Sequence, residues 1–77
     1  MFKPGNCNLA TLRKLLTHQG CKYLRTNAGH EIWSRKDLLR PITFQTHIDP
    51  VPEFIVLQIM RTIKITRKDV DKILREI

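Results

Sequence analysis

Several residue types are scarce in this 77-residue sequence, and each scarcity excludes a class of protein. The two cysteines, Cys7 and Cys21, are too few for the disulfide framework of a small secreted domain. No apolar run is long enough for a signal peptide or a membrane span. We therefore expect a cytoplasmic protein that does not enter a membrane.

Metal-ligating residues are present, but their spacing is not that of a metal site. A zinc site needs four ligands, usually in close pairs such as C-x-x-C or H-x-x-x-H. No such pair occurs among the five candidates, which are Cys7, His18, Cys21, His30 and His47. The sequence therefore predicts no metal site.

Acidic residues are also few, with seven Asp and Glu against 14 Lys and Arg, which gives a formal net charge of +7. The basic residues extend from Lys3 to Arg75 instead of forming a tail. The length suits a single domain over residues 1–77. A small, folded, basic domain is typical of proteins that bind a polyanion, most often nucleic acid. A cationic surface that serves only solubility is the simpler alternative.

The first half of the sequence predicts a helix and then a hairpin. Asn8 suits a helix N-cap, and leucines recur at helical spacing until Gly20, which predicts a helix over 9–19. Strand-forming residues follow over 21–26 and 30–35, separated by a turn at 27–29. Arg13, Lys14 and His18 are expected on the other side of the helix, where they form a solvated face or contact phosphate.

The second half predicts a third strand and two helices. Apolar and polar residues alternate over 39–48, which predicts a strand. Pro41 indicates that this strand lies at an edge or begins after the proline. Pro52 and Glu53 favour the start of a helix that is apolar almost all round as far as Ile65. A capping-box pattern at Thr66 then begins an amphipathic last helix.

This order of elements predicts the α+β class. We expect one helix, a three-stranded antiparallel meander with two-residue turns, and one or two helices, packed on one face of the sheet. The second turn is expected at Lys36-Asp37, and Trp33 and Phe44 are expected in the core.

His30 is the candidate catalytic residue because it opens the second strand directly after the turn. The unperturbed pKa of imidazole, about 6.5, allows proton transfer near neutral pH. A single histidine in a turn is, however, more often an ordinary surface residue.

Three groups of residues, taken together, resemble a known family. They are Leu12-Arg13-Lys14-Leu15-Leu16 with Gly20, Gly29-His30-Glu31-Ile32-Trp33 with Arg25, and Ile63-Lys64-Ile65-Thr66. In these, the chain from Asn8 to Leu74 resembles the HicA toxins, which are small bacterial mRNA interferases. The resemblance implies a fold similar to the double-stranded-RNA-binding domain and a ribonuclease that cleaves mRNA with His30, without metal or cofactor. It also implies a HicB-type antitoxin that covers the active site.

The candidate RNA-binding residues are basic or turn residues around the hairpin: Lys22, Arg25, Asn27, Gly29, Arg35, Lys36 and Arg40. Three alternatives remain open. The first is a non-catalytic RNA-binding module of the same fold, in which His30 only stacks or contacts phosphate. The second is a helix-turn-helix DNA binder over 53–77. The third is a protein-binding domain that presents the apolar second helix.

Overall fold

A computed structural model, which describes residues 2–77, contains one helix, three strands and two further helices in that order. A short 3-10 helix, η1 (Pro4–Asn6), comes before α1 (Leu9–His18). The other elements are β1 (Lys22–Asn27), β2 (His30–Ser34), β3 (Ile42–Gln45), α2 (Glu53–Thr62) and α3 (Arg67–Glu76). The predicted α+β class is confirmed, and the arrangement is consistent with a dsRBD-like fold.

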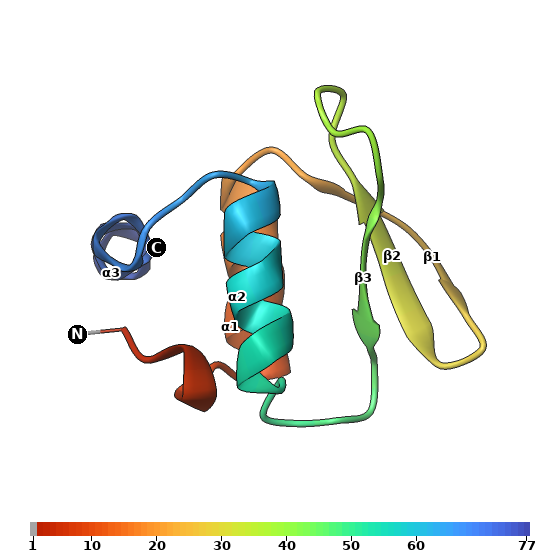
Figure 1. Cartoon of the computed structure of the whole chain (residues 1–77), viewed down its shortest axis with the longest axis horizontal. Helices are drawn as coiled ribbons and strands as arrows, with labels where there is room; N and C mark the ends of the chain where they lie inside the picture. Colours follow the sequence, from red (N-terminus) through yellow and green to blue (C-terminus); the bar gives the residue numbers. More distant parts are fainter. Residues whose placement is uncertain (1) are drawn as a thin grey trace.

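The three strands form one antiparallel sheet in the order β1-β2-β3, as the meander predicts. All three helices lie on one side of the sheet, and α1 and α2 stand between it and α3 (Figure 1). The opposite face of the sheet is covered by no helix in the described part of the chain (Figure 1). One face of the sheet is therefore open to solvent.

Helix α1 begins and ends where its capping residues predict. Asn8 accepts a hydrogen bond from the Thr11 amide at 2.8 Å, and Gly20 adopts the left-handed conformation after the helix (φ +80°). Leu12, Leu15 and Leu16 are completely buried. Burial of each such side chain stabilises the fold by about 2 kcal/mol, which makes α1 the central element of the core.

The first turn of the sheet is tight, whereas the second is longer than predicted. Ala28 and Gly29 both have positive φ, 51° and 79°, as the central pair of a type I′ hairpin turn requires. A turn does occur at Lys36-Asp37, where the Leu38 amide donates to the Arg35 carbonyl at 3.0 Å. The chain then continues as loop to Pro41, so the prediction of a two-residue connection is wrong.

The third strand is shorter than the alternating segment 39–48. It begins directly after Pro41, which lacks an N–H, and ends at Gln45, and it lies at an edge of the sheet. Within it the alternation is as expected, because Ile42 and Phe44 are buried whereas Thr43 and Gln45 are exposed. Trp33 on β2 is also buried, so both predicted core aromatics are confirmed.

Helix α2 ends at Thr62, three residues before the predicted end at Ile65. Lys64 takes the left-handed conformation (φ +58°), and the Ile65 amide donates back to the Met60 carbonyl at 3.0 Å. This turn places Ile63 in the core and leaves Thr66 free to cap α3. The predicted capping box is confirmed, with Asp69 accepting from the Thr66 amide at 2.8 Å.

Replacement of Lys64 by glycine tests this helix end. An L-residue in the left-handed region is strained by about 1–2 kcal/mol, whereas glycine is not. Part of the stability gained by relieving this strain is lost again, because glycine has greater conformational freedom in the unfolded chain. Lys64→Gly should therefore raise the free energy of unfolding by up to about 1 kcal/mol in urea titrations. Lys72→Gly, at an exposed position within α3, should lower it by about 1 kcal/mol. Equal destabilisation by both substitutions would contradict the left-handed conformation.

Candidate functional site

The open face of the sheet carries the candidate site. Residues paired across antiparallel strands lie on the same face, so Asn27, His30 and Gln45 form a row across β1, β2 and β3. The next row is Arg25, Ile32 and Thr43. His30 and its two row neighbours are exposed, which makes the row accessible to a macromolecule.

His30 is held at the start of β2 by the turn that comes before it. Its Nδ1 lies 3.2 Å from the Ala28 carbonyl oxygen. A carbonyl can only accept, so this contact requires Nδ1 to carry the proton and leaves Nε2 as the basic nitrogen of the neutral ring. The backbone of the turn thus favours one orientation and one tautomer of the candidate catalytic residue.

A second imidazole, that of His47, lies against the same turn. A Cβ atom placed on Gly29 would be 3.5 Å from His47 Cε1, and the Thr46 amide donates to the Gly29 carbonyl at 2.9 Å. The alternation over 39–48 places His47 on the same side as Thr43 and Gln45, and His47 is otherwise only one of the candidate metal ligands. Its position beside the turn follows from the pairing of β2 with β3, which the sequence pattern alone does not place in register.

The predicted RNA-binding residues divide between the two ends of the hairpin. Arg25, Asn27 and Gly29 lie on β1 or in the turn, close to His30 in the register. The others, Lys22, Arg35, Lys36 and Arg40, belong to the far end of the hairpin or to the loop after β2. Since β2 spans about 13 Å, this second group is not part of one cluster with His30.

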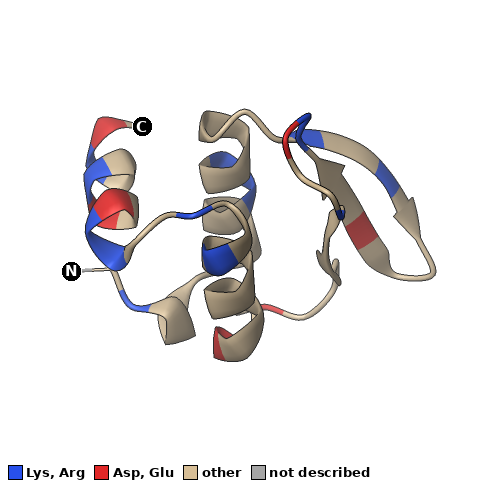
Figure 2. Cartoon of the chain, turned by 45° about the horizontal axis from the view of Figure 1, so that its top comes forward, with Lys and Arg blue, Asp and Glu red and all other residues tan. Residues whose placement is uncertain are grey.

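This far group forms a basic region of its own. Lys22, Ser34, Arg35 and Lys36 line a pocket of about 490 Å³. Arg35 is already engaged, because its Nε lies 2.6 Å from Asp37 Oδ1 and its Nη1 donates to the Gln19 carbonyl at 2.9 Å. Figure 2 shows basic residues along β1 and in the β2–β3 loop as well as on the helices. The positive charge therefore extends over both the sheet and the helices without a single centre.

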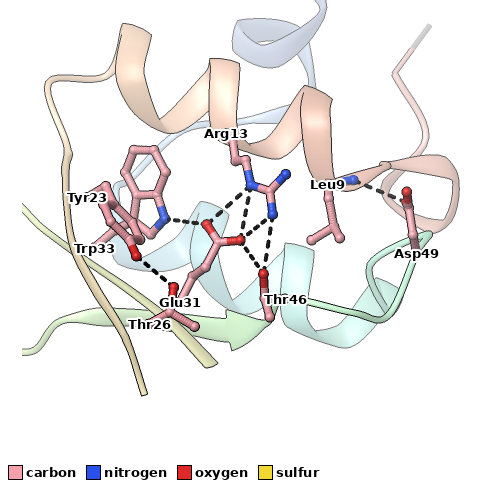
Figure 3. A network of polar contacts seen from close by, with 8 residues as sticks. All are labelled: Leu9, Arg13, Tyr23, Thr26, Glu31, Trp33, Thr46 and Asp49. Atoms are coloured by element: carbon pink, nitrogen blue, oxygen red, sulfur yellow. Dashed lines mark hydrogen bonds and ion pairs between the residues drawn. The ribbon is translucent and has the colours of Figure 1, made fainter. Parts of the chain in front are cut away.

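The residue after His30, Glu31, occupies the buried face of the sheet. Its side chain accepts hydrogen bonds from Arg13 Nε at 3.1 and 3.2 Å, from Thr46 Oγ1 at 2.8 Å and from Trp33 Nε1 at 3.1 Å (Figure 3). Arg13 Nη2 also forms an ion pair with Glu31. These contacts join α1, β2 and the segment after β3 directly behind the candidate catalytic residue.

The expectation that Arg13 lies on the solvated side of α1 is wrong. Arg13 points toward the sheet, where it balances the charge of Glu31. Glu31 is only 5% exposed. The hydrogen bonds from Arg13, aided by those from Thr46 and Trp33 and opposed by burial, lower the pKa of Glu31 to about 2. Glu31 was not predicted as a site residue. Its position two residues before Trp33 in a strand, and so on the same face, was the available signal.

Three further observations concern metal-ligating residues, the cysteines and the length of the helices. In residues 2–77 no three His, Cys, Asp or Glu side chains lie close enough together to hold a metal ion. Both cysteines are buried and free, and burial raises the pKa of Cys7 to about 11. No described helix is long and apolar enough to cross a membrane.

Replacement of Glu31 by glutamine should remove a pH-dependent part of the stability. The pKa of Glu31 is lower in the folded chain than its ordinary value of 4.5, so its stabilising effect is complete above about pH 4.5 and is lost as the pH falls toward 2. Because the Arg13 side chain is 41% exposed, we expect this effect to be on the order of 2 kcal/mol. Urea unfolding should show that the free energy of unfolding falls more between pH 7 and pH 3 for the wild type than for Glu31→Gln. Parallel losses would exclude the ion pair as the cause.

Comparison of the chain with protein-family models, with curated proteins and with solved structures found no match. A proposal for its function therefore rests on the chain's own residues and on the resemblance of its motifs.

Proposed function

We propose that this protein is a metal-independent endoribonuclease that cleaves mRNA, the toxin of a type II toxin-antitoxin system of the HicA kind. The observation that carries the proposal is the placement of His30. It is an exposed imidazole whose Nδ1 contacts the Ala28 carbonyl, on the open face of the sheet, in a row with the polar side chains of Asn27 and Gln45. The motif around His30 that resembles the HicA family supports the same function.

RNA supplies its own nucleophile, so one positioned imidazole can support cleavage. Nε2 of His30 takes the proton of a ribose 2′-OH as the oxygen attacks the adjacent phosphorus. The bond from phosphorus to the 5′-oxygen breaks, that oxygen takes up a proton from water, and a 2′,3′-cyclic phosphate remains. The proton on Nε2 then returns to the solvent. Arg25, in the next row of the same face, is the cation best placed to offset the negative charge that develops on the phosphate.

The rigidity of β2 supports this role. Glu31 follows His30 directly and is fixed by four side-chain groups, two of them from Arg13 and one each from Thr46 and Trp33. A side chain next to such an anchored residue loses little entropy when it meets its substrate. Arg13 and Glu31 would act here as positioning residues because they lie on the opposite face from the substrate.

The proposed partner is a HicB-type antitoxin. The net charge of +7 suits a protein surface of opposite charge, which would speed encounter and set the register of binding. A partner that covers the row of Asn27, His30 and Gln45 would block access of RNA to the imidazole.

A non-catalytic RNA-binding module is the second candidate, and the open basic face of the sheet favours it equally. In that case His30 would contact phosphate or a base without moving a proton. The two candidates differ in whether single-stranded RNA is cut or only bound.

Substitution of His30 by alanine should abolish most RNA cleavage. The loss of a general acid-base group lowers rates by about 10²- to 10⁴-fold, and the exposure of His30 means that the fold should survive. We expect wild-type protein to cut a single-stranded RNA and to leave DNA of the same sequence intact, because DNA lacks the 2′-OH.

His18→Ala is the matched control, because His18 is an exposed histidine at the end of α1, outside the sheet. It should cleave RNA at the wild-type rate. A His30→Ala variant that cleaves as fast as the wild type would refute the catalytic assignment. Wild-type protein that retards RNA on a gel without cutting it would favour the non-catalytic module.

Binding of RNA should weaken steeply as salt rises, because cations on the sheet displace counterions from phosphates. Each phosphate contact adds about 0.7 to the slope of log affinity against log salt for a single strand. The double variant Lys22→Ala/Arg25→Ala, made in the His30→Ala background to prevent cleavage, should show a flatter slope by about that amount per lost contact. Lys68→Ala/Lys72→Ala on α3 should keep the original slope. The opposite result would place the RNA on α3.

A further inference from the structure

A second pocket adjoins His30 and differs in chemistry from the basic region. It has a volume of about 340 Å³ and lies between the edge strand β3 and the start of α2. Its lining includes His30, Gln45, Ile48, Pro52, Phe54 and Ile55. Phe54 is the second residue of α2 and is 68% exposed, although it is a large apolar side chain.

The charge of the pocket indicates what it can hold. None of the described residues that line it is Lys, Arg, Asp or Glu, whereas the pocket at the other end of the hairpin contains Lys22, Arg35 and Lys36. A phosphate would favour the basic pocket. The pocket beside His30 suits a neutral ligand with an apolar face.

Polar groups at the rim add a second requirement. Gln45, which carries an amide, and Thr43, which carries a hydroxyl, are among the lining residues. In the described chain β3 is paired only with β2, so alternate backbone N–H and C=O groups along its outer edge are not used by the sheet. A nucleobase has a flat aromatic face, which can stack on Phe54, and hydrogen-bonding groups along its edge, which can pair with these polar groups.

We propose that this pocket holds the base of a nucleotide next to the cleaved bond, with Phe54 as the stacking residue. This assignment rests on the proposed ribonuclease activity, since His30 belongs both to that site and to the pocket lining. When a ribose and its phosphate lie at His30, the attached base is within one sugar of the pocket. Stacking on Phe54 would orient the 2′-OH toward Nε2, and Gln45 would contribute to the choice of base.

The test combines a change in the protein with a matching change in the RNA. Phe54→Ala should lower kcat/KM for a single-stranded RNA about 10- to 100-fold, which corresponds to the loss of one stacked base. Phe54→Tyr should retain the wild-type value, whereas Phe54→Leu, which keeps the apolar bulk without the aromatic face, should not. Circular dichroism of each variant checks that the fold is unchanged.

The RNA probe is a single-stranded oligonucleotide that the wild type cuts at one bond, made also with an abasic ribonucleotide on either side of that bond. One of the two abasic RNAs should be cut by the wild type as poorly as Phe54→Ala cuts the intact RNA. Phe54→Ala should cut that abasic RNA no more slowly than it cuts the intact one, because the stacked pair is already lost. Leu39→Ala, which removes a fully exposed apolar side chain from the β2–β3 loop, should behave as the wild type does.

The outcomes separate this inference from the function on which it rests. If the wild type cuts no RNA, the proposed function fails and the base pocket fails with it. If the wild type cuts RNA and Phe54→Ala cuts the intact RNA equally well, only the base pocket is wrong. That result would assign the exposed Phe54 to another occupant, such as an apolar side chain of a partner protein. Additive effects of Phe54→Ala and the abasic substitution would also overturn the proposal.

Discussion

The ion pair between Arg13 and Glu31 is the interaction on which the rest of this structure depends. It joins the first helix to the central strand, and Trp33 and Thr46 complete the hydrogen bonds of the buried carboxylate. Burial of a carboxylate without such partners would destabilise the fold by several kcal/mol. The side chain of Glu31 is therefore buried only when its three partners lie beside it. Together with the burial of Trp33, Ile42 and Phe44 on the same face, this requirement favours one orientation of α1 on the sheet and leaves the other face open.

Strand β2 carries structural residues on its buried side and candidate functional residues on its open side. Alternation along β2 places Glu31 and Trp33 toward the helices and His30 and Ile32 toward the open face. The inner residues anchor the strand through packing and hydrogen bonds, and the outer residues are accessible to a ligand. A protein of this size has few residues to spare, and the alternation allows five consecutive positions to serve both stability and function.

The open face and its surroundings offer two environments to a single-stranded nucleic acid. The far end of the hairpin is basic and suits phosphates, whereas the pocket between β3 and α2 is uncharged and contains an exposed aromatic ring. His30 lies at the border of the second environment. A strand of RNA that crossed the sheet would meet charge along its backbone and an apolar surface at one base, with the imidazole at the bond between them.

Local signals in the sequence determined the elements of this fold. Asn8 and Gly20 mark the ends of α1, Pro41 marks the start of β3, and Thr66 with Asp69 marks the start of α3, because each acts on backbone groups only a few residues away. His30 could be placed directly after a turn for the same reason. Only the tertiary structure decided which face of the hairpin is buried, that Arg13 turns inward, that His47 lies against Gly29, and that Phe54 lines the same pocket as His30. Those outcomes depend on contacts between residues far apart in the chain, where the register of β3 and the burial of one carboxylate outweigh the preferences of any single segment.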